Sequence, residues 1–364
     1  MKILIIDNAA VVKKGKSYCT NSLNGLFLSD LISCGNDITY FQFAFDTKNS
    51  ISNFDLKANG IKYTPLKIFN NRMIRYIYAY LSVIPYILKN DFVYLYYPSS
   101  FKYVPFLCRL FNKKYGMYIR GEQNITDSVS KKNYFNAYTI FTVSDYFTNY
   151  INNLVGEIKA HTIRPMIPFD EKDVVTSRNY KINGKFNLLF LGRIAEDKGI
   201  KELFKAVKIL KDKGYLFELN LVGNGEYFAE ANQILKSLDI EDIAYLKGAI
   251  YEPEKVKECY MNADIYILPT YHEGFPRTLY EAMIFGTPII TTFVGGISAL
   301  MKDRENCLKI EPQSVKCIVE GLEFAFNNYD KMVKYAQNAS ATVARIVDSK
   351  RLTHAQHLNK VLKQ

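Results

Sequence analysis

Short apolar runs alternate with stretches of helical periodicity along the whole chain. Apolar runs bounded by polar residues are typical of buried strands, and apolar residues that recur every three to four positions are typical of helices covering a sheet. The predicted strands span 2–7, 38–43, 92–97, 115–119 and 139–143 in the first half, and 187–191, 216–222, 265–269 and 288–292 in the second. This alternation favours α/β domains built on parallel sheets.

A polar, non-periodic stretch from 170 to 185 separates the two sets of strands. The length of 364 residues also fits two domains. We therefore predict two Rossmann-like, doubly wound α/β domains. The first covers residues 1–175 and the second covers 185–340, with a C-terminal helix over 341–364.

Two helices of the second half have clear boundaries in the sequence. One carries an apolar face and is followed by Gly214, where a C-terminal cap is expected. Its face consists of Ile200, Leu203, Phe204, Val207 and Leu210. The other is short, covers 277–285, and ends because Gly286 and Pro288 follow it.

Composition and charge narrow the class of protein. Hydrophobic residues make up 48% and charged residues 23%, which is the balance of a chain with a packed core and excludes disordered and fibrous proteins. The net charge is +11, and residues 1–178 carry +9 of it, with 22 Lys or Arg against 13 Asp or Glu. This asymmetry predicts an anionic surface or ligand for the first half and speaks against a uniformly basic nucleic-acid binder.

The expected location is cytoplasmic. The six cysteines form no CxxC pair and no cluster, which predicts reduced thiols and neither a zinc site nor a disulfide framework. The N-terminal stretch is interrupted by Asp7 and is expected to be a strand rather than a signal peptide. The longest uncharged apolar run, 76–88, has 13 residues, short of the roughly 20 needed to cross a bilayer. We expect at most a peripheral contact with the inner face of the plasma membrane.

Three features that suit an anionic ligand follow predicted strands of the second half, at the edge where open α/β sheets bind ligands. The first is Gly192-Arg193 with Lys198-Gly199, which leads into a helix; two cations near free helix amides suit a diphosphate. The alternative to a diphosphate site is that Arg193 and Lys198 are solvated side chains on a loop. Another of the three is Gly295-Gly296, where backbone could approach a ligand.

The remaining feature is the segment 271–281, which contains Glu273 and Glu281. Gly274 and Pro276 place Glu273 in a loop and Glu281 inside the following helix. The amides of 275–279 are then expected to be free donors that point at a negatively charged ligand. A further pair, Gly223 and Gly225 after a strand, is a weak signal because tight turns need glycine in any case.

Together these blocks resemble a known family. GRIAEDKG, LVGNGE, LKGAI and ADIYILPTYHEGFPRTLYEAMIFGTPIITTFVGG, spread over about 185–300, are similar to the C-terminal domain of retaining glycosyltransferases of family 4. The resemblance implies the GT-B fold, in which two such domains face a cleft and the C-terminal helix crosses back to the first domain. It also implies a nucleotide-diphosphate sugar as donor and a saccharide or lipid-linked saccharide as acceptor, with no part for nucleic acid.

The resemblance also implies a role for each block. Arg193 and Lys198 would hold the diphosphate beside Gly192, and Glu273 would contact the donor sugar, these three side chains being the catalytic ones. Glu281 would bind the ribose, and Lys247 and Gly248 would line the base pocket. The backbone that brackets the sugar and phosphates would be that of Gly274, Phe275, Pro276, Thr278 and Leu279.

No metal ion or cofactor is expected. Breaking a sugar–phosphate bond develops negative charge on the diphosphate, and preorganised cations and amides can stabilise it. None of the eighteen aspartates lies two residues from another, so the DxD pattern common in metal-dependent enzymes is absent from the sequence. Retention without a second well-placed carboxylate suggests front-face attack, with a diphosphate oxygen taking the acceptor proton.

The first half resembles the family only loosely. The family's N-terminal glycine-rich loop corresponds to the region of Gly15, and Arg120 stands where the family often has histidine. Gly15, Arg120 and Glu122 are the acceptor-side candidates, although Arg120 and Glu122 could equally form a structural salt bridge.

Two other functions stay open at this point. A nucleotide-sugar epimerase shares the architecture but normally needs more acid/base groups than Glu122 and Glu273. A basic module that binds anionic surfaces is the other, and the near-neutral second half argues against it. Within the main interpretation, the sequence leaves the sugar, the base and the acceptor open. A role in capsule, O-antigen or exopolysaccharide synthesis is expected only by association with chains of similar composition.

One helix of the first half carries an ambiguous apolar stripe. The stripe has the spacing 3, 4, 3, 4 and consists of Ile74, Ile77, Leu81, Ile84 and Leu88. Packing against the chain's own sheet is one interpretation, with Pro85 expected to kink or shorten the helix. In the other, the flanking Lys67, Arg72, Arg75 and Lys89 rest on anionic lipid.

Overall fold

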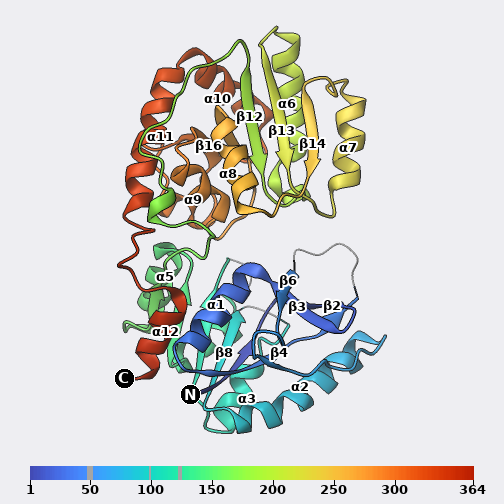
Figure 1. The fold of residues 1–364 in the computed structure, drawn as a ribbon, viewed down its shortest axis with the longest axis vertical. Helices are drawn as coiled ribbons and strands as arrows, with labels where there is room; N and C mark the ends of the chain where they lie inside the picture. Colours follow the sequence, from blue (N-terminus) through green and yellow to red (C-terminus); the bar gives the residue numbers. More distant parts are fainter. Residues whose placement is uncertain (47–51, 98–99, 122–124) are drawn as a thin grey trace. The chain divides into compact units, whose positions relative to one another are not determined.

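The computed structural model describes residues 1–46, 52–97, 100–121 and 125–364. The chain forms two compact domains (Figure 1). The first domain comprises Met1–Met166 together with Leu352–Gln364, and the second comprises Ile167–Arg351.

A seven-stranded parallel sheet forms the centre of the first domain, with the strand order β11-β10-β9-β8-β1-β4-β7. Its strands are β1 (Lys2–Ile6), β4 (Asp37–Phe41), β7 (Lys62–Tyr63), β8 (Phe92–Tyr97), β9 (Tyr115–Ile119), β10 (Thr139–Thr142) and β11 (Ala160–Thr162). The five strands predicted for the first half are confirmed as β1, β4, β8, β9 and β10. Their continuous apolar character fits a sheet buried on both faces.

Helices cover both faces of this sheet, as expected for a doubly wound domain. On one face lie α1 (Ser22–Ser33) and α12 (His354–Leu362), which share a core with β1 and β4. On the other face lie α2 (Arg72–Lys89), α3 (Val104–Leu110), α4 (Ser128–Asn136) and α5 (Asp145–Val155). The predicted helix over 341–364 is wrong in extent, because α11 ends at Ala344 and α12 begins only at His354.

The α2 helix has two apolar sides, and the one predicted to pack on the sheet does not do so. Ala79, Val83 and Ile87 are the buried residues of the helix. The 3, 4, 3, 4 stripe lies on the opposite side, where Ile77 and Leu81 are exposed. The tyrosines of α2 help to fill the space toward the core, which is why the stripe is not needed there. The helix also continues through Pro85 to Lys89 instead of stopping before it.

A small sheet that the sequence did not predict completes the first domain. It has the order β5-β2-β3-β6 and consists of β2 (Val11–Lys14), β3 (Ser17–Asn21), β5 (Ala44–Phe45) and β6 (Ser52–Asp55). These strands are short and carry few apolar residues, so their sequences lack a strand signal. Gly15 lies in the turn of the β2–β3 hairpin with φ of 60°.

The second domain is built on a six-stranded parallel sheet with the order β14-β13-β12-β15-β16-β17. Its strands are β12 (Phe186–Leu191), β13 (Phe217–Val222), β14 (Ala244–Gly248), β15 (Ile265–Leu268), β16 (Ile289–Thr292) and β17 (Leu308–Ile310). Its α-helices are α6 (Ile200–Asp212), α7 (Phe228–Ser237), α8 (Pro253–Asn262), α9 (Arg277–Ile284), α10 (Val315–Asn327) and α11 (Tyr329–Ala344). All four strands predicted for this half and the helices predicted at 200–210 and 277–285 are confirmed.

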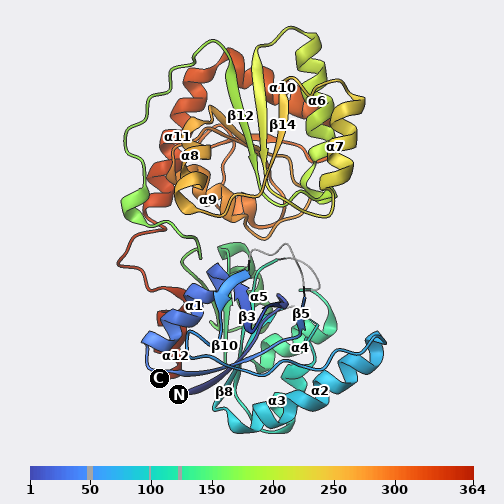
Figure 2. The same cartoon turned by 45° about the vertical axis from the view of Figure 1, so that its right-hand side comes forward.

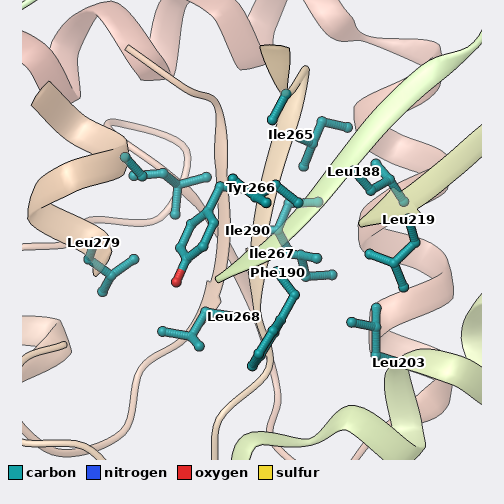
Figure 3. Packing of buried hydrophobic residues seen from close by; sticks show 14 of the residues in the cluster. Leu188, Phe190, Leu203, Leu219, Ile265, Tyr266, Ile267, Leu268, Leu279 and Ile290 are labelled. Atoms are coloured by element: carbon teal, nitrogen blue, oxygen red, sulfur yellow. The ribbon is translucent and has the colours of Figure 1, made fainter. Parts of the chain in front are cut away.

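The core of the second domain lies on both sides of its strands. Leu203 of α6 packs near Leu219 on one side, and Leu279 of α9 lies beside Tyr266 on the other (Figure 3). The α6 helix contacts α7 and α10, while α9 contacts α8 and α11. Tight packing on both faces fixes the carboxyl ends of β12 and β15, from which the candidate site is built.

The segment between the two sheets belongs to the second domain. Phe169 is buried in the core of that domain, and Val174 and Val175 pack against it. The Arg178 guanidinium donates to the carbonyls of Tyr260 and Phe285 at 3.0 Å each, among other oxygens at the ends of α8 and α9. The domain therefore begins at Ile167 rather than near 185, because this polar segment is anchored to helix ends instead of forming a free linker.

Candidate active site

The candidate site lies at the carboxyl ends of β12 and β15. These strands are neighbours in the sheet, and β13 extends from one side of the pair while β16 extends from the other. Such a reversal of strand order opens a crevice at the carboxyl edge of an α/β sheet, where ligands bind. Gly192 and Arg193 follow β12, and the 269–276 loop follows β15 and leads into α9.

Lys198 is buried at this edge and forms an ion pair with Glu273. Only 8% of Lys198 is exposed, and its ammonium group contacts a Glu273 carboxylate oxygen. The ammonium also lies 3.4 Å from the Thr270 hydroxyl and 3.5 Å from the carbonyl oxygen of His272. The sequence predicted both charged residues at this edge but not their contact, because 75 residues separate them.

The environment of Glu273 opposes its charge. Burial raises the pKa of the Glu273 carboxyl above its ordinary value, and the neighbouring Lys198 ammonium pulls the pKa back down. A buried carboxylate is retained only when it is paired and hydrogen-bonded, and the Lys198 ammonium meets that need.

Arg193 is not part of this buried pair. It is about half exposed, and its guanidinium contacts Asp197 at 3.2 Å and Glu226 at 3.0 Å. Asp197 also approaches the Lys198 ammonium, at 3.6 Å. The two cations expected to act together thus share one acidic neighbour, and each has a carboxylate partner of its own. Lys198 and its partner Glu273 are largely buried, whereas Arg193 and its partners are open to solvent.

The N-terminus of α9 provides backbone donors. Pro276 precedes the helix and makes no side-chain cap, so the first turn keeps amide groups without an intrahelical acceptor. Leu279 is an exception to the expected free amides, because its N–H donates to the Pro276 carbonyl at 3.1 Å. The side chains of Phe275 and Leu279 are buried in the core. Phe275 can therefore offer a ligand only its backbone, and the Leu279 amide is already engaged within the chain.

Glu281 lies further along α9 in a nearly closed environment. The Tyr260 hydroxyl of α8 donates to one carboxylate oxygen at 3.0 Å. Burial raises the pKa of Glu281 to about 7, against the opposing effects of the Tyr260 hydrogen bond and the Arg277 charge. Nothing in the sequence pointed to Tyr260. Thr278 is fixed nearby, because the Tyr266 hydroxyl donates to its side-chain oxygen at 2.7 Å.

Lys247 and Gly248 are the last two residues of β14, the strand beside β13. Gly248 has φ of 73°, and its carbonyl accepts from the Gly223 amide at 2.8 Å. Lys247 is exposed, and together with Ile250 and Cys259 it lines a cavity of about 460 Å³ between α8 and the sheet. None of Arg193, Lys198, Glu273 and Glu281 lines this cavity. The cavity therefore touches the candidate site only through Lys247.

The glycines of the GNGE turn are explained by packing. A Cβ on Gly223 would lie 1.8 Å from the Gly192 carbonyl oxygen, and one on Gly225 would lie 2.2 Å from that of Ile194. The loops after β12 and β13 therefore approach each other too closely for side chains. The candidate role of these glycines in contacting a ligand is not required to account for them.

Gly199 offers a direct test of the packing of this edge. Its φ is 70°, and a Cβ there would lie 2.2 Å from the Pro269 carbonyl oxygen. Gly214 has a similar φ of 81° but nothing within 4 Å, so it is a matched control. Both alanine variants lose roughly 1–2 kcal/mol to left-handed backbone. We expect Gly199→Ala to lose about 2 kcal/mol more in denaturant unfolding, from overpacking; equal losses would contradict the close approach.

The first-domain candidates are dispersed. Arg120 follows β9, and its guanidinium reaches the Asn8 side chain after β1 at 3.5 Å. It lies near this sheet's own reversal between β1 and β8, which keeps it at a ligand-binding edge. Gly15 sits in the turn of the β2–β3 hairpin, and its acceptor-side role stays a prediction. Glu122 lies outside the described residues.

The histidines and cysteines of the described residues do not gather into a metal site. Within 1–46, 52–97, 100–121 and 125–364, no group of three or more His, Cys, Asp or Glu residues is placed to hold a metal ion. His354 is buried and contacts the Tyr94 hydroxyl at 2.5 Å. Burial holds the pKa of His354 well below its ordinary value, as expected for a core histidine.

Comparisons with known proteins identify a family match and relatives of this chain. Residues 175–342 match the family described as glycosyl transferases group 1. This match covers most of the second domain and somewhat less than half of the chain. The capsular polysaccharide biosynthesis glycosyltransferase CapM of Staphylococcus aureus is 30% identical over 152 residues, which cover 40% of this chain and 38% of CapM. The chain thus matches well under half the length of this curated relative.

Solved structures match the chain over its full length. Sucrose-phosphate synthase from Thermosynechococcus elongatus aligns with a TM-score of 0.73 at 19% identity, covering 100% of this chain and 98% of that one. HepE from Anabaena, solved in complex with UDP-glucose, aligns with a TM-score of 0.68 at 17% identity over 100% and 98% of the two chains. At such identities the likeness concerns the fold alone, and the two parallel-sheet α/β domains are those of the GT-B fold.

Proposed function

We propose that this chain is a retaining glycosyltransferase that moves a sugar from a nucleotide-diphosphate sugar to a hydroxyl acceptor. The acceptor is a saccharide or a lipid-linked saccharide of a bacterial surface polysaccharide, as the likeness to CapM suggests. The enzyme works in the cytoplasm and uses neither a metal ion nor a further cofactor. The complex of HepE with UDP-glucose supports the choice of a uridine nucleotide as the first donor to test.

The observation that carries the proposal is the buried Lys198–Glu273 pair next to the uncapped N-terminus of α9. A cation and helix amides at one sheet edge suit a diphosphate, which is doubly negative. A carboxylate held by that cation suits the hydroxyl groups of a sugar, which donate hydrogen bonds. The cationic end of this ion pair thus suits the diphosphate, and its carboxylate end suits the sugar.

The proposed step is a front-face displacement. The bond between the anomeric carbon and the diphosphate oxygen breaks, and its electron pair stays on the diphosphate. The acceptor oxygen forms a new bond to the anomeric carbon on the same face, and its proton passes to the departing diphosphate oxygen. Lys198, Arg193 and the α9 amides stabilise the negative charge that grows there, while Glu273 positions the sugar.

The remaining residues have binding roles in this proposal. Glu281 accepts hydrogen bonds from the two ribose hydroxyls, with one of its oxygens already oriented by Tyr260. Lys247 and Gly248 border the base. Arg120, at the carboxyl edge of the first sheet, is the proposed contact on the acceptor side.

The test is turnover of a panel of nucleotide-diphosphate sugars by the purified chain in excess EDTA. We expect release of the nucleoside diphosphate from one donor, at a rate that added Mg²⁺ does not change by more than about twofold. Loss of activity in EDTA that Mg²⁺ or Mn²⁺ restores would overturn the metal-free step. A sugar that changes configuration without needing an acceptor would identify an epimerase instead.

A further inference from the structure

The exposed side of α2 is apolar along its whole length. Five of its large apolar side chains are between 49% and 72% exposed, namely Met73, Ile74, Ile77, Leu81 and Leu88. Their spacing places them on one side of the helix, opposite Ala79, Val83 and Ile87 in the core. Single exposed apolar residues need no explanation, but a continuous row of them marks an interaction surface.

The neighbouring helix α3 extends this surface. The α2 and α3 helices run side by side in both views of the first domain (Figures 1 and 2). The Tyr103 amide donates to the Tyr80 hydroxyl at 3.3 Å, and the Lys113 ammonium donates to the Leu88 carbonyl at 3.0 Å. Phe106 and Leu110 of α3 are 56% and 64% exposed. We call the five α2 residues together with these two the α2–α3 face.

Exposed cations lie at both ends of α2, and acidic residues are rare in this part of the sequence. Residues 67–114 contain eight Lys or Arg and one acidic residue, Asp91. Asp91 is engaged at the sheet, where it accepts from the Lys2 amide at 2.7 Å. Of the cations, Lys67 and Arg72 are exposed at the start of α2 and Lys89 is exposed at its end. An apolar centre between exposed cations complements a surface with an oily interior and negative headgroups.

We propose that the α2–α3 face docks on an anionic lipid bilayer, with its apolar side chains inserted among the acyl chains. A helix of 18 residues lying in the interface is about 27 Å long, and its apolar side reaches roughly 5–10 Å into the boundary of headgroups and chains. Each cation near such a surface strengthens the attraction. Under the proposed function the docked enzyme meets a lipid-linked acceptor at the membrane, whereas docking itself does not depend on that function.

The geometry is that of a helix lying on a bilayer rather than crossing it. None of the helices in the described ranges is both long and apolar enough to span a membrane. The buried side of α2 is committed to the domain core, so only the outer side is available for lipid. Arg75 is half buried over the rings of Phe43 and Phe45, so the electrostatic test uses Arg72 and Lys89 instead.

The experiment is flotation of the full chain with two kinds of vesicle, pure phosphatidylcholine and phosphatidylcholine with 30% phosphatidylglycerol. We expect binding to the anionic vesicles, reduced but not abolished as salt rises, because screening weakens the ionic part and leaves the apolar part. Arg72→Glu with Lys89→Glu is expected to weaken binding at low salt. These substitutions are on exposed positions outside the site, so nucleotide-sugar turnover should stay unchanged.

The decisive variant is Ile77→Ser with Leu81→Ser, which makes the centre of the face polar. We expect the partition coefficient on anionic vesicles to fall at least about tenfold, since two apolar side chains no longer insert. The matched control is Ile158→Ser with Leu216→Ser, two residues that are 85% and 70% exposed outside the face. This control should bind vesicles like the wild type.

Several results would overturn the proposal. Absence of flotation at low salt would do so, as would equal binding by the Ile77/Leu81 variant and the control. Sedimentation equilibrium tests whether a second copy of the chain covers the face instead. A wild-type dimer that becomes monomeric in the Ile77/Leu81 variant, together with an absence of vesicle binding, would assign the face to dimerisation. Donor turnover is measured in parallel, so failure to dock and failure to transfer sugar are separate results.

Discussion

Replacing Lys198 with alanine is expected to reduce turnover at least about 100-fold, with a smaller effect on donor affinity. The reason is that the negative charge on the leaving diphosphate grows in the transition state, so a cation there stabilises that state more than the bound donor. Arg193→Ala should lower turnover in the same sense. Steady-state kinetics that separate kcat from KM measure both.

The control separates this effect from damage to the fold. Removal of Lys198 leaves Glu273 buried without its partner, which can destabilise the domain by about 3–5 kcal/mol. Turnover is therefore expressed per folded protein, and Lys208→Ala removes a more exposed lysine that also pairs with a carboxylate, Asp212. A small alkylamine should restore part of the activity of Lys198→Ala. Near-normal turnover in both the Lys198 and Arg193 variants would refute the diphosphate role.

Glu281→Ala is expected to weaken donor binding roughly 10- to 150-fold, because a hydrogen bond to a charged group contributes about 1.5–3 kcal/mol. The raised pKa of Glu281, about 7, adds a pH signature. The ionised carboxylate is the better acceptor for ribose hydroxyls, so the affinity of the wild type for an intact nucleotide sugar should fall as the pH drops below 7. Glu281→Gln should show a flat profile over the same range.

The same carboxyl group affects the unliganded fold in the opposite direction. Its pKa is higher in the folded chain than the ordinary 4.5, so the folded state binds the proton more tightly and loses stability as pH rises from about 4.5 to 7. The loss relative to Glu281→Gln should approach about 3 kcal/mol. Glu258→Gln, at an exposed carboxylate on α8, is the control. Parallel pH profiles of unfolding for wild type and Glu281→Gln would contradict the burial of this charge.

Much of the fold could be predicted because parallel strands buried on both faces are continuous apolar runs. FVYLYY and NLLFL have no charged residue, and the one amide side chain among them is that of Asn187; they became β8 and most of β12. The small sheet escaped prediction because segments such as VVKK and SYCTN have no such pattern. The domain boundary was misplaced because the anchoring of Arg178 to distant carbonyls has no local sequence signal.

The site shows the same division between local and distant information. Local turns and caps predicted a loop position for Glu273 and a helical position for Glu281, and the structure has both. The pairing of Lys198 with Glu273 and of Glu281 with Tyr260 depends on how β12, β15 and α8 pack, which spacing along the chain does not encode. For α2, a regular stripe identified the helix but not which of its two apolar sides faces the core.

Binding of a nucleoside diphosphate tests the central claim most directly. Calorimetric titration in EDTA with UDP, and then with the other nucleoside diphosphates, measures whether the β12–β15 edge is a donor site independently of any acceptor. The account predicts saturable 1:1 binding of at least one of them, weakened tenfold or more by Glu281→Ala and unchanged by Glu258→Gln. Absence of binding by every nucleoside diphosphate, or equal affinities of Glu281→Ala and Glu258→Gln, would contradict it.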